Sequence, residues 1–215
     1  CFAFFHPAMP DEPLIFVEVA LTRGIPRSVQ DLLVEHRDAI AEDRADTAVF
    51  YSISNCQSGL ASISFGNSLI KQVAADLALE LPGLKTFVTL SPIPGLMAWL
   101  TEEGIPHDPQ DDARMRALAA RYLVRMKAKG DLPRDPVARF HLGNGAELHR
   151  INWLGDTSRR GLSQFGSLMV NYLYVLDDIE GNHERYTTEG KVACSSQVRD
   201  QRRRARKHLK GDPVT

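Results

Sequence analysis

Apolar and polar positions alternate along the chain in blocks that predict both strands and helices. Short runs rich in β-branched residues and bounded by turn residues predict strands at residues 14–21, 47–54, 59–64, 86–90 and 168–176. The second and third of these runs lie close enough in sequence to predict a hairpin. From Ser68 the apolar positions recur at helical spacing, which predicts a helix that ends near Pro82.

The predicted strand 59–64, this helix and the predicted strand 86–90 follow one another directly. A crossover of that length predicts two parallel neighbouring strands joined in the right-handed sense. Ligands of such units bind at the carboxyl ends of the strands, so a site is expected there.

The rest of the chain predicts further elements of both kinds. Helices are expected shortly after Ser28 and at residues 94–102 and 111–129. Asn144-Gly145 stands between the strand-like runs 137–142 and 147–153, and this dipeptide predicts a β-hairpin. Together the elements predict an α+β fold, with an α/β-type mixed sheet and flanking helices.

The composition, 43% hydrophobic and 25% charged, fits a single globular domain over residues 1–215. Charged residues interrupt every apolar stretch before it reaches the roughly 18 to 20 residues of a membrane helix, so no membrane partner is expected. The three cysteines form no CxxC pair, which predicts neither a disulfide framework nor a metal site and favours a cytoplasmic location. Because the chain begins at Cys1 without a signal sequence, we expect it to be a piece of a longer polypeptide.

Residues 199–210 predict a basic C-terminal helix, with seven Lys or Arg residues and one acid. Such a run could contact nucleic acid or an acidic partner, but it is more often a solvated helix end. No aromatic or glycine residues are interleaved with the arginines, which favours the second interpretation, and no nucleic-acid partner is expected.

The turn Ser64–Ser68 leads from a predicted strand into the helix that contains Lys71. Free amides at a helix N-terminus, with Gly66 permitting close approach, can bind a phosphate or pyrophosphate. The alternative is a simple turn in which Asn67 or Ser68 caps the helix.

Ser91 ends a predicted strand where such a unit would hold a ligand. The next residue is Pro92, which has no N–H to contribute to an oxyanion hole, so an acyl-enzyme hydrolase is disfavoured. On position alone, Ser91 could equally be a polar strand end whose hydroxyl bonds locally.

His141 is the best histidine candidate, because on a strand it would project opposite Phe140 and Leu142 beside the predicted turn. His149, across the same hairpin, is its rival. A histidine near its reference pKa of about 6.5 can donate and recover a proton close to neutral pH.

Several blocks of the chain, in order, resemble the catalytic domain of malonyl-CoA decarboxylases. The most specific are Leu90–Gly95 (LSPIPG) and Asp135–Ala146 (DPVARFHLGNGA). The others are Phe50–Ser54, Gly59-Leu60, Leu69–Lys71, Arg150–Trp153, Arg160-Gly161 and Leu168–Tyr172. The resemblance covers nearly the whole chain and implies a GNAT-like acyltransferase fold, in which a strand, a pyrophosphate loop and a helix hold coenzyme A.

The resemblance also implies an activity, the conversion of malonyl-CoA to acetyl-CoA and carbon dioxide. It makes Ser91 the proton acceptor that orients the carboxylate and His141 the proton donor. No separate cofactor or metal is implied, since coenzyme A is part of the substrate. The implied substrate-binding segment consists of Ala61, Ser62, Ile63, Ser64, Phe65, Gly66, Asn67 and Ser68, together with Ser91 and His141. A GNAT-like acyltransferase that uses the same anion loop is the alternative.

The chain departs from the family pattern at four places. The region from Thr101 to Arg134 is shorter than in some members. The helical N-terminal domain through which the family oligomerises is missing, so a homo-oligomer is expected only of a full-length protein. Ser64 stands where some relatives carry glutamate. The C-terminus is no peroxisomal SKL signal, which fits a cytoplasmic, bacterial protein.

Overall fold

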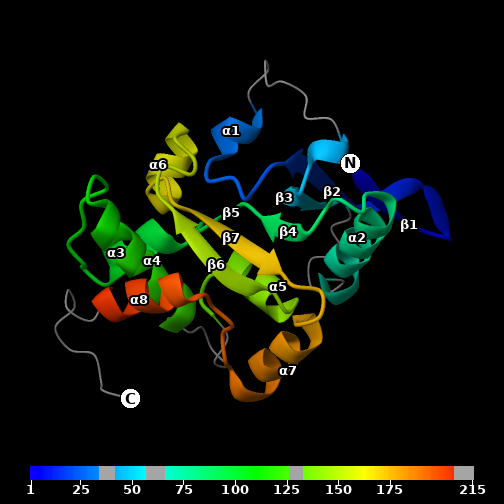
Figure 1. The fold of residues 1–215 in the computed structure, drawn as a ribbon. Helices are drawn as coiled ribbons and strands as arrows, with labels where there is room; N and C mark the ends of the chain where they lie inside the picture. Colours follow the sequence, from blue (N-terminus) through cyan, green and yellow to red (C-terminus); the bar gives the residue numbers. More distant parts are fainter. Residues whose placement is uncertain (34–41, 57–65, 126–132, 206–215) are drawn as a thin grey trace.

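The computed structural model describes residues 1–33, 42–56, 66–125 and 133–205. In this part of the chain seven strands form one mixed sheet in the order β1-β2-β3-β4-β7-β5, and β6 pairs with the other edge of β7 (Figure 1). The strands are β1 (Phe2–His6), β2 (Met9–Thr22), β3 (Thr47–Asn55), β4 (Thr86–Thr89), β5 (Ser91–Pro92), β6 (Glu147–Asn152) and β7 (Met169–Tyr174). The predicted α+β fold with a mixed sheet is confirmed.

Helices pack around this sheet and bury its apolar side chains. They are α1 (Val29–Leu33), α2 (Gly66–Glu80), α3 (Leu96–Glu102), α4 (Asp112–Arg125), α5 (Pro136–Gly143), α6 (Arg159–Phe165), α7 (Ile179–Glu189) and α8 (Ser196–Ala205), with a 3-10 turn at Glu42–Arg44. The predicted helical face of α2 is confirmed, since Ile70, Val73, Ala74 and Leu77 are all buried. Helix α5 packs beside α2 and α7, and α4 packs beside α8 near β6.

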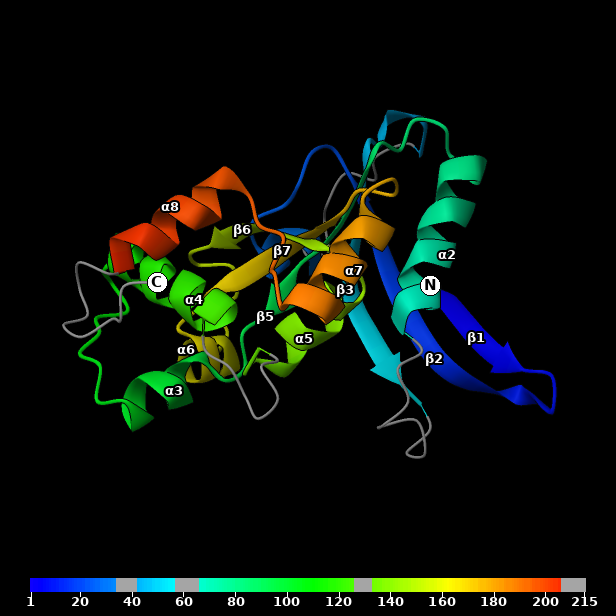
Figure 2. The same cartoon turned by 90° about the horizontal axis from the view of Figure 1, so that it is seen from below.

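The N-terminal strands form an antiparallel ribbon that continues into β3. Figure 2 shows this β1–β2 ribbon extending past α2, away from helices α3, α4, α6 and α8. The sequence predicted β2 from residue 14 onward but missed β1, whose short FAFFH run has no turn signal in front of it. Pairing with β2 is what makes this segment a strand.

The parallel pair of the sheet is β3 with β4, which α2 connects. The predicted strand 59–64 and its hairpin with 47–54 lie outside the described residues. The predicted parallel pairing of residues 59–64 with 86–90 therefore involves residues that the structure does not describe. Among the described strands, β4 pairs with β3 on one edge and with β7 on the other. The strand–helix–strand unit exists, but β3 is its first strand.

The predicted strand 137–142 is wrong, because this segment is helix α5. Asp135 caps it: its Oδ1 accepts from the amides of Val137 at 3.0 Å and Ala138 at 2.9 Å. Pro136 follows as the first helical residue, where its fixed φ favours the helix and its missing N–H costs nothing.

The predicted Asn-Gly hairpin is wrong for the same reason. Asn144 caps the C-terminus of α5, and Gly145, at φ +77°, turns the chain into β6 in a left-handed conformation that suits glycine. A Cβ at Gly145 would lie 2.2 Å from the carbonyl oxygen of Ile179, so the close approach of α7 also requires glycine here.

The remaining expectations concern the later elements. Strands β6 and β7, helix α4 and the basic helix α8 lie where the sequence predicts them, as far as these residues are described. Helices α6 and α7 were not predicted, since both are short and polar on their exposed faces. Across the described part of the chain, no helix combines the length and apolar character needed to cross a membrane.

Candidate active site

Ser91 lies where the segment after β4 stops pairing with β3 and begins to pair with β7. The amide of Leu90 still donates to the carbonyl of Phe50 on β3, at 3.2 Å, whereas Ser91 already pairs with Val170 on β7. Strand β3 runs on to Asn55 without a described partner on that edge. Strands β3 and β5 therefore diverge in a V, and Ser91 lies at the point where they separate.

Polar bonds hold this turn in place between the β4 and β5 pairings with β7. The side-chain amide of Asn171 donates to the carbonyl of Thr89 at 2.9 Å, and the backbone amide of Tyr172 donates to Thr89 Oγ1 at 3.3 Å. These bonds satisfy polar groups that the sheet ladder leaves free in the core, which fixes the backbone on which Ser91 stands.

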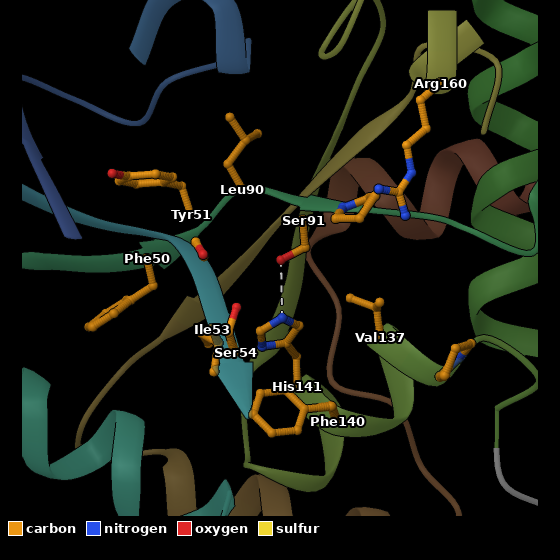
Figure 3. Close-up of a pocket in the computed structure, with 13 residues that line it drawn as sticks. Phe50, Tyr51, Ile53, Ser54, Leu90, Ser91, Val137, Phe140, His141 and Arg160 are labelled. Atoms are coloured by element: carbon orange, nitrogen blue, oxygen red, sulfur yellow. Dashed lines mark hydrogen bonds between the residues drawn. The ribbon is translucent and has the colours of Figure 1, made fainter. Parts of the chain in front are cut away.

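His141 reaches the same point from helix α5. Its Nε2 lies 3.0 Å from Ser91 Oγ (Figure 3), and both residues are buried, with exposed fractions of 4% and 7%. The pairing of these two residues expected from the sequence is thus present, although a helix supplies the histidine. His149, the rival, lies on β6 with its Nδ1 3.2 Å from Glu147 Oε1 and does not line the cavity described below.

The two ring nitrogens of His141 each face a hydroxyl group. Nε2 lies 3.0 Å from Ser91 Oγ, and Nδ1 lies 2.9 Å from the Tyr174 hydroxyl. Ser91 Oγ in turn lies 3.0 Å from Thr89 Oγ1, and when it donates there it can accept from Nε2–H while Nδ1 accepts from Tyr174. In this tautomer His141 does not receive the Ser91 proton, unlike the histidine beside an activated serine nucleophile.

Burial keeps the His141 ring neutral. Tyr172 stacks on it at 4.5 Å between ring centroids with an interplanar angle of 25°, and Phe140 approaches edge-on at 5.0 Å. Loss of solvation lowers the pKa of His141 to about 3. Burial also raises the pKa of Tyr174 well above its ordinary value, so its hydroxyl stays protonated and can donate a hydrogen bond.

The pair opens onto a cavity of about 600 Å³ between β3, the β4–β5 turn, α5 and α6. This volume is within the ~300–1,000 Å³ of small-molecule and cofactor sites. The lining residues are Phe50, Tyr51, Ser52, Ile53, Ser54, Leu90, Ser91, Pro92, Pro136, Val137, Phe140, His141 and Arg160. Of these, Arg160 alone carries a formal charge at neutral pH. Apart from it and the His141 imidazole, the lining side chains are apolar or carry hydroxyl groups.

The substrate-binding segment expected from the sequence is described only in part. Ala61 to Phe65 lie outside the described residues, and Gly66, Asn67 and Ser68 form the first turn of α2. The described part of the segment is therefore the N-terminal end of a helix, a position where free amides can attract an anion. Among the described residues, no group of three or more His, Cys, Asp or Glu side chains could hold a metal ion.

Three residues of the site were not singled out from the sequence for their chemistry: Thr89, Tyr174 and Arg160. Thr89 precedes Ser91 by two positions, and Tyr174 follows Tyr172 by two, so each pair lies on one face of its strand. These i, i+2 pairs of polar residues in buried strands were the sequence signal that could have identified Thr89 and Tyr174.

Comparison with known proteins supplies a family context. The family described as malonyl-CoA decarboxylase C-terminal domain matches residues 1–112 and 107–212. The chain is 36% identical to a mitochondrial malonyl-CoA decarboxylase of Anser anser anser, over 92% of this chain and 48% of that protein. It is 33% identical to the mitochondrial enzyme of Rattus norvegicus, over 92% and 50%. The chain thus spans about half the length of the curated relatives it matches.

Solved structures give the same picture. The malonyl-CoA decarboxylase of Rhodopseudomonas palustris matches with a TM-score of 0.87 and 48% identity, over 93% of this chain and 52% of that one. That of Agrobacterium vitis matches with a TM-score of 0.86 and 50% identity, over 93% and 56%. A GNAT-like decarboxylase in complex with isobutyryl-CoA, 19% identical, matches with a TM-score of 0.54 over 81% and 76%, and confirms the GNAT-like fold.

Proposed function

The chain belongs to the malonyl-CoA decarboxylase family, and we propose that it converts malonyl-CoA to acetyl-CoA and carbon dioxide. The observation that carries the proposal is the buried bond between Ser91 and His141 at the cavity wall. The C2–carboxylate bond breaks, its electron pair moves into the thioester carbonyl, and carbon dioxide leaves. A proton must then reach C2 of the resulting enolate, and one proton is consumed per turnover.

In this proposal His141 supplies that proton from Nε2–H. The ring is neutral, so the donor is an imidazole rather than an imidazolium. The transfer leaves an imidazolate, which is a weaker base than the enolate carbon, and neutral imidazoles serve as electrophiles elsewhere. Tyr174, when it donates to Nδ1, keeps the proton on the Nε2 side and stabilises the imidazolate. The imidazolate takes up a proton from solvent once product has left, which restores the neutral ring.

Ser91 orients the departing carboxylate. Its hydroxyl can rotate from Thr89 Oγ1 toward a bound carboxylate oxygen while its lone pair accepts from His141. Once carbon dioxide has formed, Nε2–H breaks its bond to Ser91 and transfers its proton to C2. Pro92 offers no N–H for an oxyanion hole, and the serine proton is not directed to His141, so a covalent acyl-serine is not part of the mechanism.

Coenzyme A fits the edge of β3 that lines the cavity. Beyond Phe50 this edge lacks a described strand partner, and Tyr51 to Ser54 form the wall. The two amides of a pantetheine arm can pair with such an edge as an added strand does. The pyrophosphate would then reach the N-terminus of α2, where free amides attract anions. The binding segment Ala61–Phe65 expected from the sequence lies outside the described residues and stays a prediction.

Incubation with malonyl-CoA alone, following acetyl-CoA and carbon dioxide, tests the reaction. Ser91→Ala and His141→Asn are each expected to lower kcat by at least about 10²-fold with little change in coenzyme A affinity. His149→Asn, outside the cavity, is the matched control and should retain activity. Near-normal turnover in either variant would remove that residue from the mechanism. Release of free coenzyme A only when an amine is added would favour the acyltransferase alternative instead.

A further inference from the structure

We propose that Arg160 forms a subsite for the free carboxylate of the acyl group, and so sets the preference for a malonyl over an acetyl thioester. The inference rests on the proposed function. Arg160 is the single formally charged side chain among the described residues that line the cavity of Ser91 and His141. A malonyl group differs from an acetyl group by one negative charge, and an arginine matches a carboxylate in both charge and shape.

Helix α6 places this side chain by its capping. Ser158 Oγ accepts from the amide of Gly161 at 3.0 Å, which fixes the first turn, where Arg160 stands. A Cβ at Gly161 would lie 2.4 Å from the carbonyl oxygen of Asp156, so this turn also packs too tightly for another residue there. The backbone under Arg160 is therefore well defined although its side chain is exposed.

One hydrogen bond within α6 orients the Arg160 side chain at the cavity wall. Arg160 Nε donates to Gln164 Oε1 at 3.2 Å, one helical turn along α6. This bond uses the inner nitrogen and leaves the two terminal amino groups for a ligand. Figure 3 shows the side chain reaching from its helix toward the strand segment of Ser91. The acid near Arg160 is Asp156, whose Oδ1 already accepts from Gln30 and from the amide of Ser158, at 3.0 and 2.9 Å.

The chemistry predicts how the subsite should show itself in kinetics. The ion pair exists with the bound carboxylate but is lost as neutral carbon dioxide forms, so it stabilises the ground state more than the transition state. An interaction of that kind strengthens binding without raising kcat. Arg160 is therefore a specificity residue, whereas an arginine that stabilised the enolate oxygen would act on kcat.

Binding of malonyl-CoA and acetyl-CoA separates this role from a contact with the phosphates of coenzyme A. In a His141→Asn background, which slows turnover under the proposed mechanism so that binding can be measured first, Arg160→Gln should raise the Kd of malonyl-CoA about tenfold, the size of one charge-assisted hydrogen bond. The Kd of acetyl-CoA should change by less than about twofold, because acetyl-CoA lacks the carboxylate. Arg159→Gln, on the same exposed turn but outside the cavity lining, is the matched control and should change neither Kd.

Steady-state kinetics on otherwise unchanged protein completes the test. Arg160→Gln should raise KM for malonyl-CoA and leave kcat at or above its original value, and Arg160→Lys should recover part of the affinity. Equal weakening for both thioesters, a lowered kcat at unchanged affinity, or no effect on either would each overturn the inference. Failure of the unsubstituted chain to form acetyl-CoA would instead contradict the proposed function, and the binding comparison would still report on Arg160.

Discussion

The imidazole of His141 is enclosed by Tyr172, Tyr174 and Phe140, and burial lowers its pKa to about 3. In the unfolded chain the same ring takes up a proton near pH 6.5. Between these two pH values the unfolded state binds more protons, so the free energy of unfolding falls as the pH falls through that window.

Acid should therefore destabilise the protein through this one residue. At pH 5 the unfolded ring is protonated and the folded ring is not, which lowers the free energy of unfolding by about 2 kcal/mol relative to neutral pH. Urea denaturation of the original chain and of His141→Asn at pH 7 and pH 5 measures the difference. Equal losses of stability in the two proteins would show that His141 is already protonated in the fold at pH 5.

Tyr174 is predicted to position His141 rather than to touch the substrate. Tyr174→Phe removes the donor to Nδ1 and should lower kcat roughly tenfold, the effect of one hydrogen bond, with KM little changed. In this variant, ¹⁵N NMR of His141 should show a smaller population of the Nε2–H tautomer. Tyr172→Phe is the control, since the Tyr172 hydroxyl is buried and makes no hydrogen bond within the described structure. A kcat unchanged by Tyr174→Phe, or lowered equally by Tyr172→Phe, would contradict the assignment.

At the scale of elements, the ends of helix α5 decide where His141 points. Asp135 caps the start, and Gly145 ends the following turn in a left-handed conformation against Ile179. Between these two points there is room for two helical turns, and they bring His141 under the β4–β5 turn. Both ends are thus part of the site, although neither touches the cavity.

Gly145→Ala should be much more costly than a left-handed glycine without neighbours. Its new Cβ would meet the Ile179 carbonyl at 2.2 Å and would also be strained at φ +77°, which together cost roughly 2–5 kcal/mol. Gly190→Ala is the matched control at φ +63°, where nothing lies within 4 Å, and should cost only roughly 1–2 kcal/mol. Denaturant midpoints of both variants give the comparison. Equal losses would mean that α7 moves aside without cost.

At the scale of the whole molecule, the divergence of β3 from β5 creates the space for a ligand. β3 stays paired with β2, while the chain that leaves β4 crosses to β7. The basic helix α8 packs at the far end instead, where Val198 and Ala205 are buried and α4 is its neighbour. That packing gives α8 a structural role, as the solvated-helix interpretation of its charges requires.

Much of this architecture can be predicted from the sequence because local patterns carry it. The apolar runs of β2, β3, β4 and β7 and the helical period of α2 and α4 were identified correctly. Helix α5 was not identified, because the alternation of Phe140, His141 and Leu142 predicts a strand and Asn144-Gly145 predicts a hairpin turn. The helix cap at Asp135 was not taken into account. Strand β1 needed its partner, and the short helices α6 and α7 have weak periodicity of their own.

The sequence by itself determined the elements with strong periodicity, the motif blocks of a known family, and the two residues, Ser91 and His141, on which the proposed chemistry depends. Only the tertiary structure decided that a helix presents the histidine, that burial keeps the ring neutral, and that Arg160 faces the same cavity. The reason is physical: side-chain period and turn chemistry are local properties of the chain. A pKa, a tautomer and the charge lining a cavity instead depend on neighbours that come from distant segments.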